Sequence, residues 1–233
     1  MCGGELSAIA FGCLTVNYCM PTIRQCEPTG AMVQTPVSPQ PLFLELPPDL
    51  ALQVTPEQFA ALAVTNRDLR LERTATGALI VNPPTGGISG KRNLSISIQL
   101  GNWSEANEQL GEAFDSSTGF ELPNGANRSP DASWVRRDRW DALTREQQEG
   151  FVPLCPDFVV ELRSRSDSLN TTRAKLQEYL DNGTQLGWLI DPQNQRVEIY
   201  RPGCEVETLD CPDTLSGEPI LPGFILKLQR IWA

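Results

Sequence analysis

The sequence predicts an α/β domain in which helices flank a mixed β-sheet. The elements expected along the chain run in the order helix, three strands, strand, helix, strand, which is typical of this class. Residues 158–162 (FVVEL) form a short, nearly unbroken apolar run, as in strands buried on both faces. A chain of 233 residues with 40% apolar content can bury one substantial core, or two small ones.

Residues 1–54 are expected to lie outside this domain as a disordered or extended N-terminal arm, because five prolines fall between residues 33 and 50. Met32 offers a second start, so residues 1–31 are either an over-called start or part of the arm. They lack the basic segment of a secretory signal, and seven cysteines give no disulfide framework, so a cytoplasmic protein is expected. Residues 55–233 then form the domain, and no apolar run approaches membrane-spanning length.

The first part of the domain is expected to contain a helix, a hairpin and a longer helix. Thr55 and Pro56 begin the stretch TPEQFAALAV as a helix cap and a first helical residue. Residues 69–82 (LRLERTATGALIVN) predict a hairpin that turns at a Thr-Gly pair, with apolar residues at alternating positions. Apolar residues at helical spacing then predict a helix over residues 88–107.

Strands dominate the second part of the domain. Residues 111–135 predict three short strands, separated by Ser-Ser-Thr-Gly and Pro-Asn-Gly turns. The remaining elements expected are a short helix over 144–149, the apolar strand over 158–162, a helix over 168–182 closed by Gly183, and strands over 186–191 and 196–201.

The absence of histidine narrows the chemistry. It excludes Ser-His and Cys-His nucleophile pairs and the usual zinc sites, and leaves carboxylates, Lys, Arg, Ser and Tyr. Such a set most often recruits a hard divalent cation, Mg²⁺ or Mn²⁺, onto oxygen ligands. Glu161 interrupts the apolar strand at 158–162, and a buried unpaired charge is costly, so a cation, a basic partner or solvent exposure must compensate it.

The charge is uneven along the chain. The formal net charge is −10, yet residues 128–175 carry nine Lys or Arg against eight Asp or Glu. This stretch is therefore either a local basic surface that can face a phosphate backbone or an ordinary mixed-charge surface in contact with water.

Two carboxylates are candidates for one metal site. Asp131 begins a predicted strand in RSPDASW, and Glu161 lies in another. Adjacent strands are about 5 Å apart, so the two groups could share a cation. Structural alternatives stay open: Asp131 as a turn residue, Glu161 in a salt bridge to Arg163 or Lys175, and Lys175 as a solvated helix lysine. Asp157, on the same strand face as Glu161, is expected to cap the start of the strand.

Four ordered blocks resemble the PD-(D/E)XK nuclease superfamily and, within it, a bacterial family of restriction endonuclease domain proteins of uncharacterised function. The blocks are Ser129-Pro130-Asp131, Val159 to Ser168 (VVELRSRSDS), Lys175 with Tyr179 and Gly183, and Leu186 to Pro192 (LGWLIDP). The similarity covers roughly residues 55–205. The resemblance implies a restriction-endonuclease-like core and a Mg²⁺-dependent or Mn²⁺-dependent endonuclease acting on DNA.

The resemblance also implies a set of site residues. Asp131, Glu161 and the Leu162 carbonyl would hold the metal, and Glu72 would be an additional acidic contributor. The family pattern Glu-x-Lys is broken here, because Arg163 stands at the lysine position and arginine cannot deprotonate a water. The lysine would instead come from the following helix, as Lys175, and would orient or deprotonate the attacking water.

Three arginines are candidates for phosphate contacts, because the guanidinium fork matches phosphate oxygens: Arg163, Arg165 and Arg173. Double-strand cutting would favour a homodimer. The alternative function is a catalytically inactive nuclease-like module that binds DNA or a protein partner, and a third is a metal-dependent hydrolase of another phosphorylated substrate.

Overall fold

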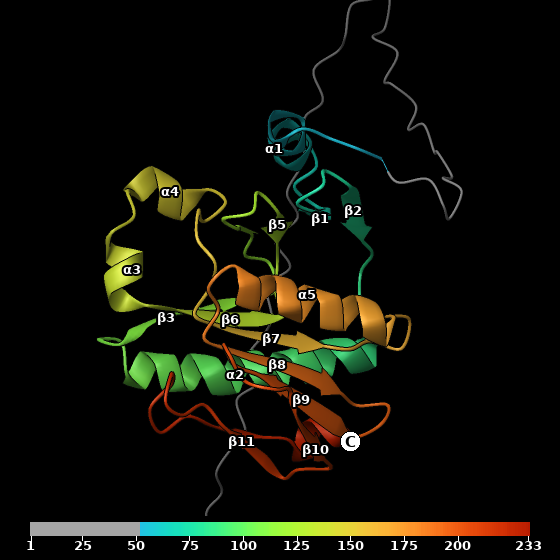
Figure 1. The fold of residues 1–233 in the computed structure, drawn as a ribbon, viewed down its shortest axis with the longest axis vertical. Helices are drawn as coiled ribbons and strands as arrows, with labels where there is room; N and C mark the ends of the chain where they lie inside the picture. Colours follow the sequence, from blue (N-terminus) through green and yellow to red (C-terminus); the bar gives the residue numbers. More distant parts are fainter. Residues whose placement is uncertain (1–51) are drawn as a thin grey trace, which may run out of the picture. The chain divides into compact units, whose positions relative to one another are not determined.

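Two larger β-sheets, of six and four strands, and one two-stranded sheet organise the computed structural model, which describes residues 52–233 (Figure 1). The larger sheet has six strands in the order β10-β9-β8-β7-β6-β3. Its strands are β3 (Gly111–Asp115), β6 (Ala132–Arg136), β7 (Phe158–Leu162), β8 (Leu186–Asp191), β9 (Arg196–Tyr200) and β10 (Glu207–Asp210). Only β7 and β8 pair in parallel, and the other neighbours are antiparallel. The mixed sheet predicted from the sequence is confirmed.

The smaller sheet has four strands in the order β2-β1-β5-β4. They are β1 (Arg70–Arg73), β2 (Leu79–Asn82), β4 (Phe120–Glu121) and β5 (Asn127–Arg128). The β1–β2 hairpin turns at Gly77, whose φ of 94° lies in the left-handed region that glycine adopts without a steric cost. The alternating apolar residues of this hairpin are not all buried: Leu71 is buried, but Leu69 and Val81 are about half exposed.

Residues 52–54 join this sheet as well. Gln53 forms a bridge with Ala78, and the Val54 amide donates to the Gly77 carbonyl at 2.8 Å. The rest of the predicted arm, including residues 1–31, lies outside the described residues. Helix α1 (Pro56–Thr65) follows directly, with the capping box formed between Thr55 and Gln58.

Residues 111–135 form four strands, where the sequence indicated three. The last predicted strand is divided at Ser129-Pro130: β5 pairs within the small sheet, and β6 within the large one. Proline has no N–H to give to a strand ladder, which ends the pairing of β5. The chain therefore crosses from one sheet to the other at Pro130, and Asp131 stands at that crossing.

Each face of the large sheet is covered by a helix (Figure 1). On one face, Ile96 and Leu100 of α2 (Gly87–Ala106) pack against strand residues that include Phe158, Val160 and Leu162. On the other face, α5 (Leu169–Asp181) packs through Leu176 and Tyr179 onto side chains that include Val159. Successive residues of β7 thus alternate between the faces, and Glu161 belongs to the α5 face.

The C-terminal segment, for which the sequence indicated no elements beyond residue 201, completes the α2 face. It contains β11 (Thr214–Ser216), β12 (Ile225–Lys227) and α6 (Gln229–Trp232). Its buried apolar residues join the α2-side core: Leu215, Leu221, Phe224, Leu226, Leu228 and Ile231. Two short helices, α3 (Arg137–Asp141) and α4 (Arg145–Glu149), connect β6 to β7.

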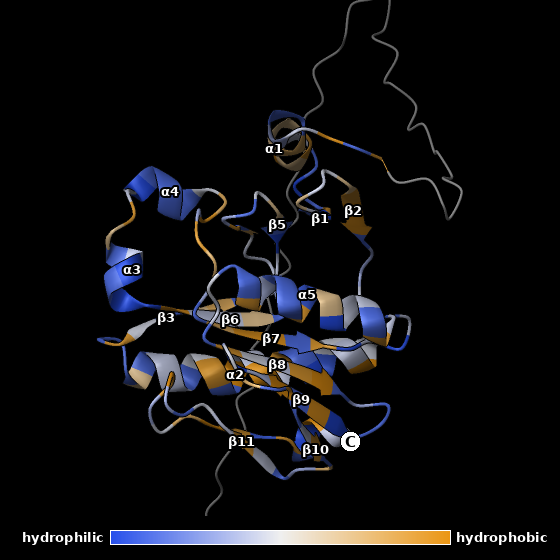
Figure 2. Ribbon diagram, in the orientation of Figure 1, coloured by the Kyte–Doolittle hydropathy of each residue, from blue (hydrophilic) through white to orange (hydrophobic). Residues whose placement is uncertain are grey.

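The hydropathy of the elements follows this layering. The strands of the large sheet are mainly apolar, whereas α5 carries polar residues on its outer side (Figure 2). Among the described helices, none combines the length and the apolar character needed to cross a membrane.

Candidate active site

Asp131, which directly precedes β6, and Glu161 of β7 lie next to each other at one end of β7. The β6–β7 ladder pairs Ala132 with Val160, so one step further along the same register sets Asp131 opposite Glu161. Asp131 is anchored there, because its Oδ2 accepts a hydrogen bond of 2.8 Å from the Leu162 amide. Its Oδ1 accepts one of 3.2 Å from Asn93 of α2.

Glu161 is buried, with only 6% of the residue exposed. Its Oε1 lies 2.8 Å from Lys175 Nζ and accepts a 3.1 Å hydrogen bond from the Tyr179 hydroxyl. Burial raises the pKa of Glu161 to about 7: Lys175 opposes this shift, and the negative charges of Asp131 and Glu72 add to it. The carboxylate is therefore only partly compensated by the protein.

Lys175 extends from α5 into the space between the two sheets. Its Nζ contacts Glu161, lies 3.0 Å from Glu72 Oε1, and donates to the Ser129 carbonyl at 3.3 Å. Burial alone would lower the pKa of Lys175, but the carboxylates of Glu161 and Glu72 outweigh it and raise the pKa to about 12. Lys175 is therefore a protonated donor in this setting.

Glu72 comes from β1 in the small sheet and is 3% exposed. Besides Lys175, it pairs with Arg128 of β5, whose NH1 lies 3.2 Å from Glu72 Oε2. Burial would raise the pKa of Glu72, but Lys175 and Arg128 together lower it. Glu72 is thus held as a carboxylate by two cations of the protein.

The donors around Asp131 and Glu161 fit a hard divalent cation. The Leu162 carbonyl faces the Asp131 side of β7, because the N–H and C=O of a strand residue point the same way and this N–H binds Asp131. Two carboxylates and one carbonyl are oxygen ligands of the kind that Mg²⁺ and Mn²⁺ prefer. Burial, with the nearby charges of Asp131 and Glu72 adding to it, raises the pKa of Glu161, and a bound cation would favour the charged form of this carboxylate. Within residues 52–233, no three His, Cys, Asp or Glu side chains converge closely enough to hold a metal by themselves.

Two of the three arginines predicted to contact phosphate are engaged in ion pairs. Arg163 NH1 lies 2.9 Å from Asp191 Oδ2. Arg173 donates hydrogen bonds to both carboxylate oxygens of Glu198, with its Nε 3.0 Å from each. Arg165 is exposed in the segment between β7 and α5. None of the three contacts Asp131 or Glu161 among the described ion pairs; the arginine that approaches Asp131 is Arg70, at 3.5 Å.

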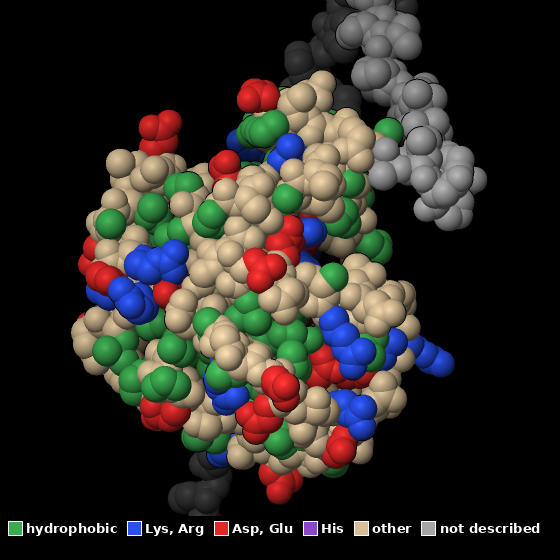
Figure 3. Space-filling view, in the orientation of Figure 1, with side chains coloured by type: hydrophobic (Ala, Val, Ile, Leu, Met, Phe, Trp, Pro, Cys, Tyr) green, Lys and Arg blue, Asp and Glu red, His purple; other side chains and the backbone are tan. Residues whose placement is uncertain are grey.

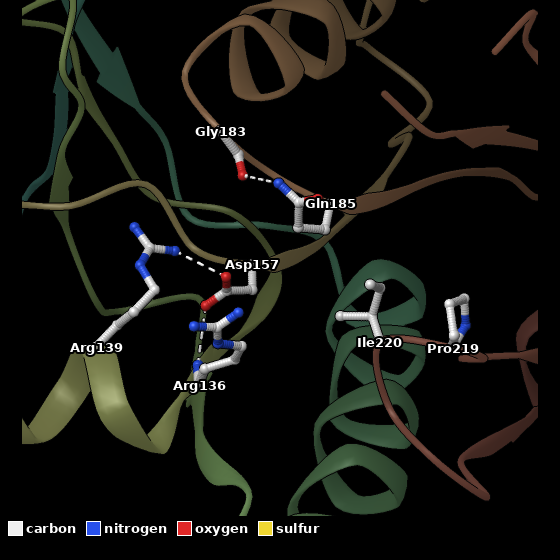
Figure 4. Close-up of a pocket in the computed structure, with 7 residues that line it drawn as sticks. All are labelled: Arg136, Arg139, Asp157, Gly183, Gln185, Pro219 and Ile220. Carbon is white, nitrogen blue, oxygen red and sulfur yellow. Dashed lines mark hydrogen bonds and ion pairs between the residues drawn. The ribbon is translucent and has the colours of Figure 1, made fainter. Parts of the chain in front are cut away.

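The opposite end of β7 holds a second buried carboxylate, Asp157. It accepts a hydrogen bond of 2.9 Å from the Arg136 amide and lies 2.9 Å from Arg139 NH1 (Figure 4). It borders a cavity of about 530 Å³ that Gln185 and Ile220 also line. Asp157 is therefore satisfied by fixed partners, in agreement with the structural role expected for it.

Basic and acidic side chains are interspersed on the face of the molecule drawn in Figure 3. Many of the charged groups are paired, as in the exposed pairs Arg136–Asp138 and Arg145–Glu149. Of the two readings of the charge distribution, the face in view resembles a mixed-charge surface more than a basic one.

Two groups around the site were not indicated by the sequence: Arg128 and Asn93, which reach it from β5 and α2. Tyr179 was named only within the block that carries the family resemblance, without a role at the site. The one available signal was the spacing of Lys175 and Tyr179, which places both on one flank of a helix. Arg128 and Asn93 are 33 and 68 residues away from Glu161 in sequence, and no local pattern connects them to it.

Comparison with known proteins places this arrangement in a family. Residues 56–229 match the family described as "Uma2: Putative restriction endonuclease". The fold is similar to that of "a putative nuclease belonging to DUF820" from Anabaena variabilis ATCC 29413, with a TM-score of 0.63 and 23% identity over 77% of this chain and 97% of that chain. A "cryoEM structure DrdV-DNA complex" aligns with a TM-score of 0.33 and 17% identity over 55% of this chain and 78% of that chain. No curated protein matches. Because the family match spans most of its length, the chain belongs to the Uma2 family of restriction-endonuclease-like proteins.

Proposed function

We propose that this domain is an endonuclease that hydrolyses DNA phosphodiester bonds with the help of Mg²⁺ or Mn²⁺. One observation carries the proposal: Asp131, Glu161 and Lys175 come from three separate segments and meet at one end of β7. Two carboxylates beside a protonated amine are what phosphodiester hydrolysis requires, because negative charge gathers on the phosphoryl oxygens in the transition state. The family description supports nuclease chemistry.

Asp131, Glu161 and the Leu162 carbonyl would hold the cation. When bound, Mg²⁺ or Mn²⁺ supplies Lewis-acid stabilisation of the charge that develops on the phosphate. Lys175 has three N–H donors, and its raised pKa keeps it protonated at neutral pH. We therefore assign Lys175 the role of orienting the attacking water and offsetting phosphate charge, in preference to that of a base.

The proposal is tested by plasmid cleavage. The purified chain is incubated with supercoiled plasmid and Mg²⁺ or Mn²⁺, beside Asp131→Asn, Lys175→Met and the matched control Asp138→Asn, which alters an exposed ion pair outside the site. Cleavage by the wild type and the control, lost in both site variants and in EDTA, is expected. Equal cleavage by all four proteins would mean that the cleavage does not depend on this site, and it would contradict the proposal.

A non-cutting module that binds DNA is the second candidate. It is favoured by the absence, within residues 52–233, of a cluster of three side chains that could hold a metal, and by Arg163 at the place of the family's lysine. Its signature is retained DNA binding, measured by fluorescence anisotropy, with no cleavage at any metal concentration. Light scattering of the complex would at the same time test the homodimer that double-strand cutting favours.

A further inference from the structure

Five charged side chains of alternating sign form a continuous row through the candidate site. Lys175 Nζ lies 2.8 Å from Glu161 Oε1 and 3.0 Å from Glu72 Oε1. Arg128 NH1 lies 3.2 Å from Glu72 Oε2, and Arg128 Nε lies 2.5 Å from Glu178 Oε2. The side chains are between 4% and 17% exposed. The row begins at a proposed metal ligand and ends on α5, the helix that also carries Lys175.

The two carboxylates that flank Lys175 differ in how their oxygens are used. Both oxygens of Glu72 are occupied: Oε1 by Lys175 and, at 3.4 Å, by the Asn82 amide, and Oε2 by Arg128. Among the described contacts of Glu161, by contrast, both fall on Oε1. One oxygen of Glu161 is therefore without a described protein contact, whereas each oxygen of Glu72 already binds at least one group of the protein.

Stability alone is a weak reason for such a row. Buried ion pairs lose so much solvation that apolar replacements of the same volume are often no less stable. What the row does provide is a fixed direction for Lys175. Its two carboxylate partners come from different sheets, β1 and β7, and Arg128 ties β1 back to Glu178, one turn beyond Lys175 on α5.

We propose that Glu72 is a positioning residue for Lys175, held in place by Arg128 and Glu178, and that it is not a ligand of the metal. This inference rests on the proposed nuclease function, since it concerns the amine that would face the phosphate. It replaces the role of acidic metal contributor that the family resemblance implies for Glu72.

Metal binding separates the two roles of Glu72 without any need for activity. Titration of the metal-free chain with Mn²⁺ alone, followed by calorimetry, compares Glu72→Gln with Glu161→Gln. We expect Glu72→Gln to keep the wild-type affinity within about threefold and Glu161→Gln to lose at least about tenfold, because even loss of a hydrogen-bonding partner of a ligand costs about that much. Equal losses in the two variants would make Glu72 a ligand and overturn the proposal.

Amine labelling reports the position of Lys175 directly. The chain has only three lysines, and Lys91 and Lys227 are exposed, so they serve as internal standards for acetylation followed by mass spectrometry. Glu72→Gln removes one of the two charges that hold Lys175, and its labelling relative to the standards should rise about fivefold or more. Unchanged labelling of a folded Glu72→Gln protein would contradict the proposal.

Kinetics then test the functional consequence. Glu72→Gln should lower kcat for plasmid cleavage about 30-fold or more with KM for DNA unchanged, and Glu72→Asp should restore part of the loss because it keeps the charge. The matched control is Glu149→Gln, which removes the same charge from an exposed pair with Arg145 and should change neither parameter. A rise in KM with constant kcat would point to DNA binding and would refute the positioning role.

A second variant keeps the test decisive if Glu72→Gln does not fold. Glu178→Gln removes the far anchor of Arg128, and Glu178 is partly exposed, so the fold should tolerate it. It should raise Lys175 labelling about twofold with unchanged Mn²⁺ affinity, and unchanged labelling would count against the row. If the wild type cuts no DNA at all, the nuclease function fails, while the Mn²⁺ and labelling results still decide the role of Glu72.

Discussion

The two ends of β7 each present a buried carboxylate to the same face of the sheet, and the protein treats them differently. Asp157 is 3% exposed and is bound by the Arg136 amide and the Arg139 guanidinium. Glu161, four residues further on, is 6% exposed, shares its cation Lys175 with Glu72, and stands beside the carboxylate of Asp131.

The difference separates a structural charge from a candidate reactive one. At Asp157 two fixed donors from one neighbouring segment satisfy one carboxylate. At Glu161 the pKa is raised to about 7 by burial, and nearby negative charge adds to the shift. Groups with such perturbed pKa values gather at functional sites, although ion-pair networks also produce them. Burial of a charge alone therefore does not identify the site, and the balance of charge around it is more informative.

Plasmid cleavage should differ most strongly between variants at Glu161 and at Asp157. Glu161→Gln should reduce plasmid cleavage by about a hundredfold or more, because it removes a proposed metal ligand beside Lys175. Asp157→Asn, the same change of charge at the other end of β7, should leave cleavage within about twofold. Initial rates at saturating Mg²⁺ measure both. A comparable loss of cleavage in Glu161→Gln and Asp157→Asn would show that the Glu161 end of β7 is no more important for cleavage than the Asp157 end.

Much of this comparison could be predicted from the sequence, since it depends on local periodicity. The period of two along FVVEL places Glu161 and Asp157 on one face, and the helical spacing of Lys175 and Tyr179 places the amine near the strand ends. The structure brings Asp131, Glu161 and Lys175 together, as the adjacent strands suggested for the two carboxylates and as the family resemblance implied for Lys175. Their roles as metal and water ligands stay predictions.

The remainder depends on how distant segments pack, which local patterns do not encode. Arg128 lies in a two-residue strand, too short to give an alternation, and the change of sheet at Pro130 was hidden inside one expected strand. Arg163 and Arg173 illustrate the same limit: their sequence suited phosphate contacts, yet each has found a buried carboxylate on β8 or β9. The ion pairs that Arg163 and Arg173 form with distant strands could not be predicted from the local sequence.

The second effect is on stability against pH. The pKa of Glu161 is about 7 in the folded chain, against an ordinary value of 4.5 that holds for the unfolded chain. Between about pH 4.5 and 7 the folded state therefore binds more protons than the unfolded state. Stability is therefore lost as pH rises from about 4.5 to 7, by about 3 kcal/mol in the metal-free protein. The pKa of Glu72 is lowered, so the stability that Glu72 contributes is lost only as the pH falls below about 4.5, outside this range. Urea unfolding in EDTA at several pH values measures the slope.

Glu161→Gln is the control for this slope, because glutamine does not titrate. The free energy of unfolding of the variant should lack the decline between about pH 5 and 7 that the wild type shows. Parallel curves for the two proteins would mean that Glu161 does not carry the shift, and the contrast with Asp157 would lose its electrostatic basis.

A third prediction concerns stability near pH 7.5 without metal, where the two variants should change it in opposite directions. Asp157→Asn breaks the pair with Arg139 and weakens the bond to the Arg136 amide, and should cost about 1–3 kcal/mol. Glu161→Gln removes a carboxylate whose ionisation burial penalises, leaves Glu72 paired with Lys175, and should leave stability equal or higher. Urea midpoints with unchanged m-values test this, and two equal losses would contradict it.

DNA affinity should also distinguish the two ends of β7, by a smaller margin. Arg165, in the exposed segment after Glu161, should contact phosphate if the C-terminal end of β7 faces DNA, whereas Arg136 at the other end should not. Arg165→Ala should then lower the slope of log affinity against log salt by about one, and weaken binding a fewfold, while Arg136→Ala leaves the slope unchanged. Fluorescence anisotropy at four or more salt concentrations measures it. Equal slopes for all three proteins would remove Arg165 from the interface, and a change only in Arg136→Ala would place DNA at the opposite end of the strand.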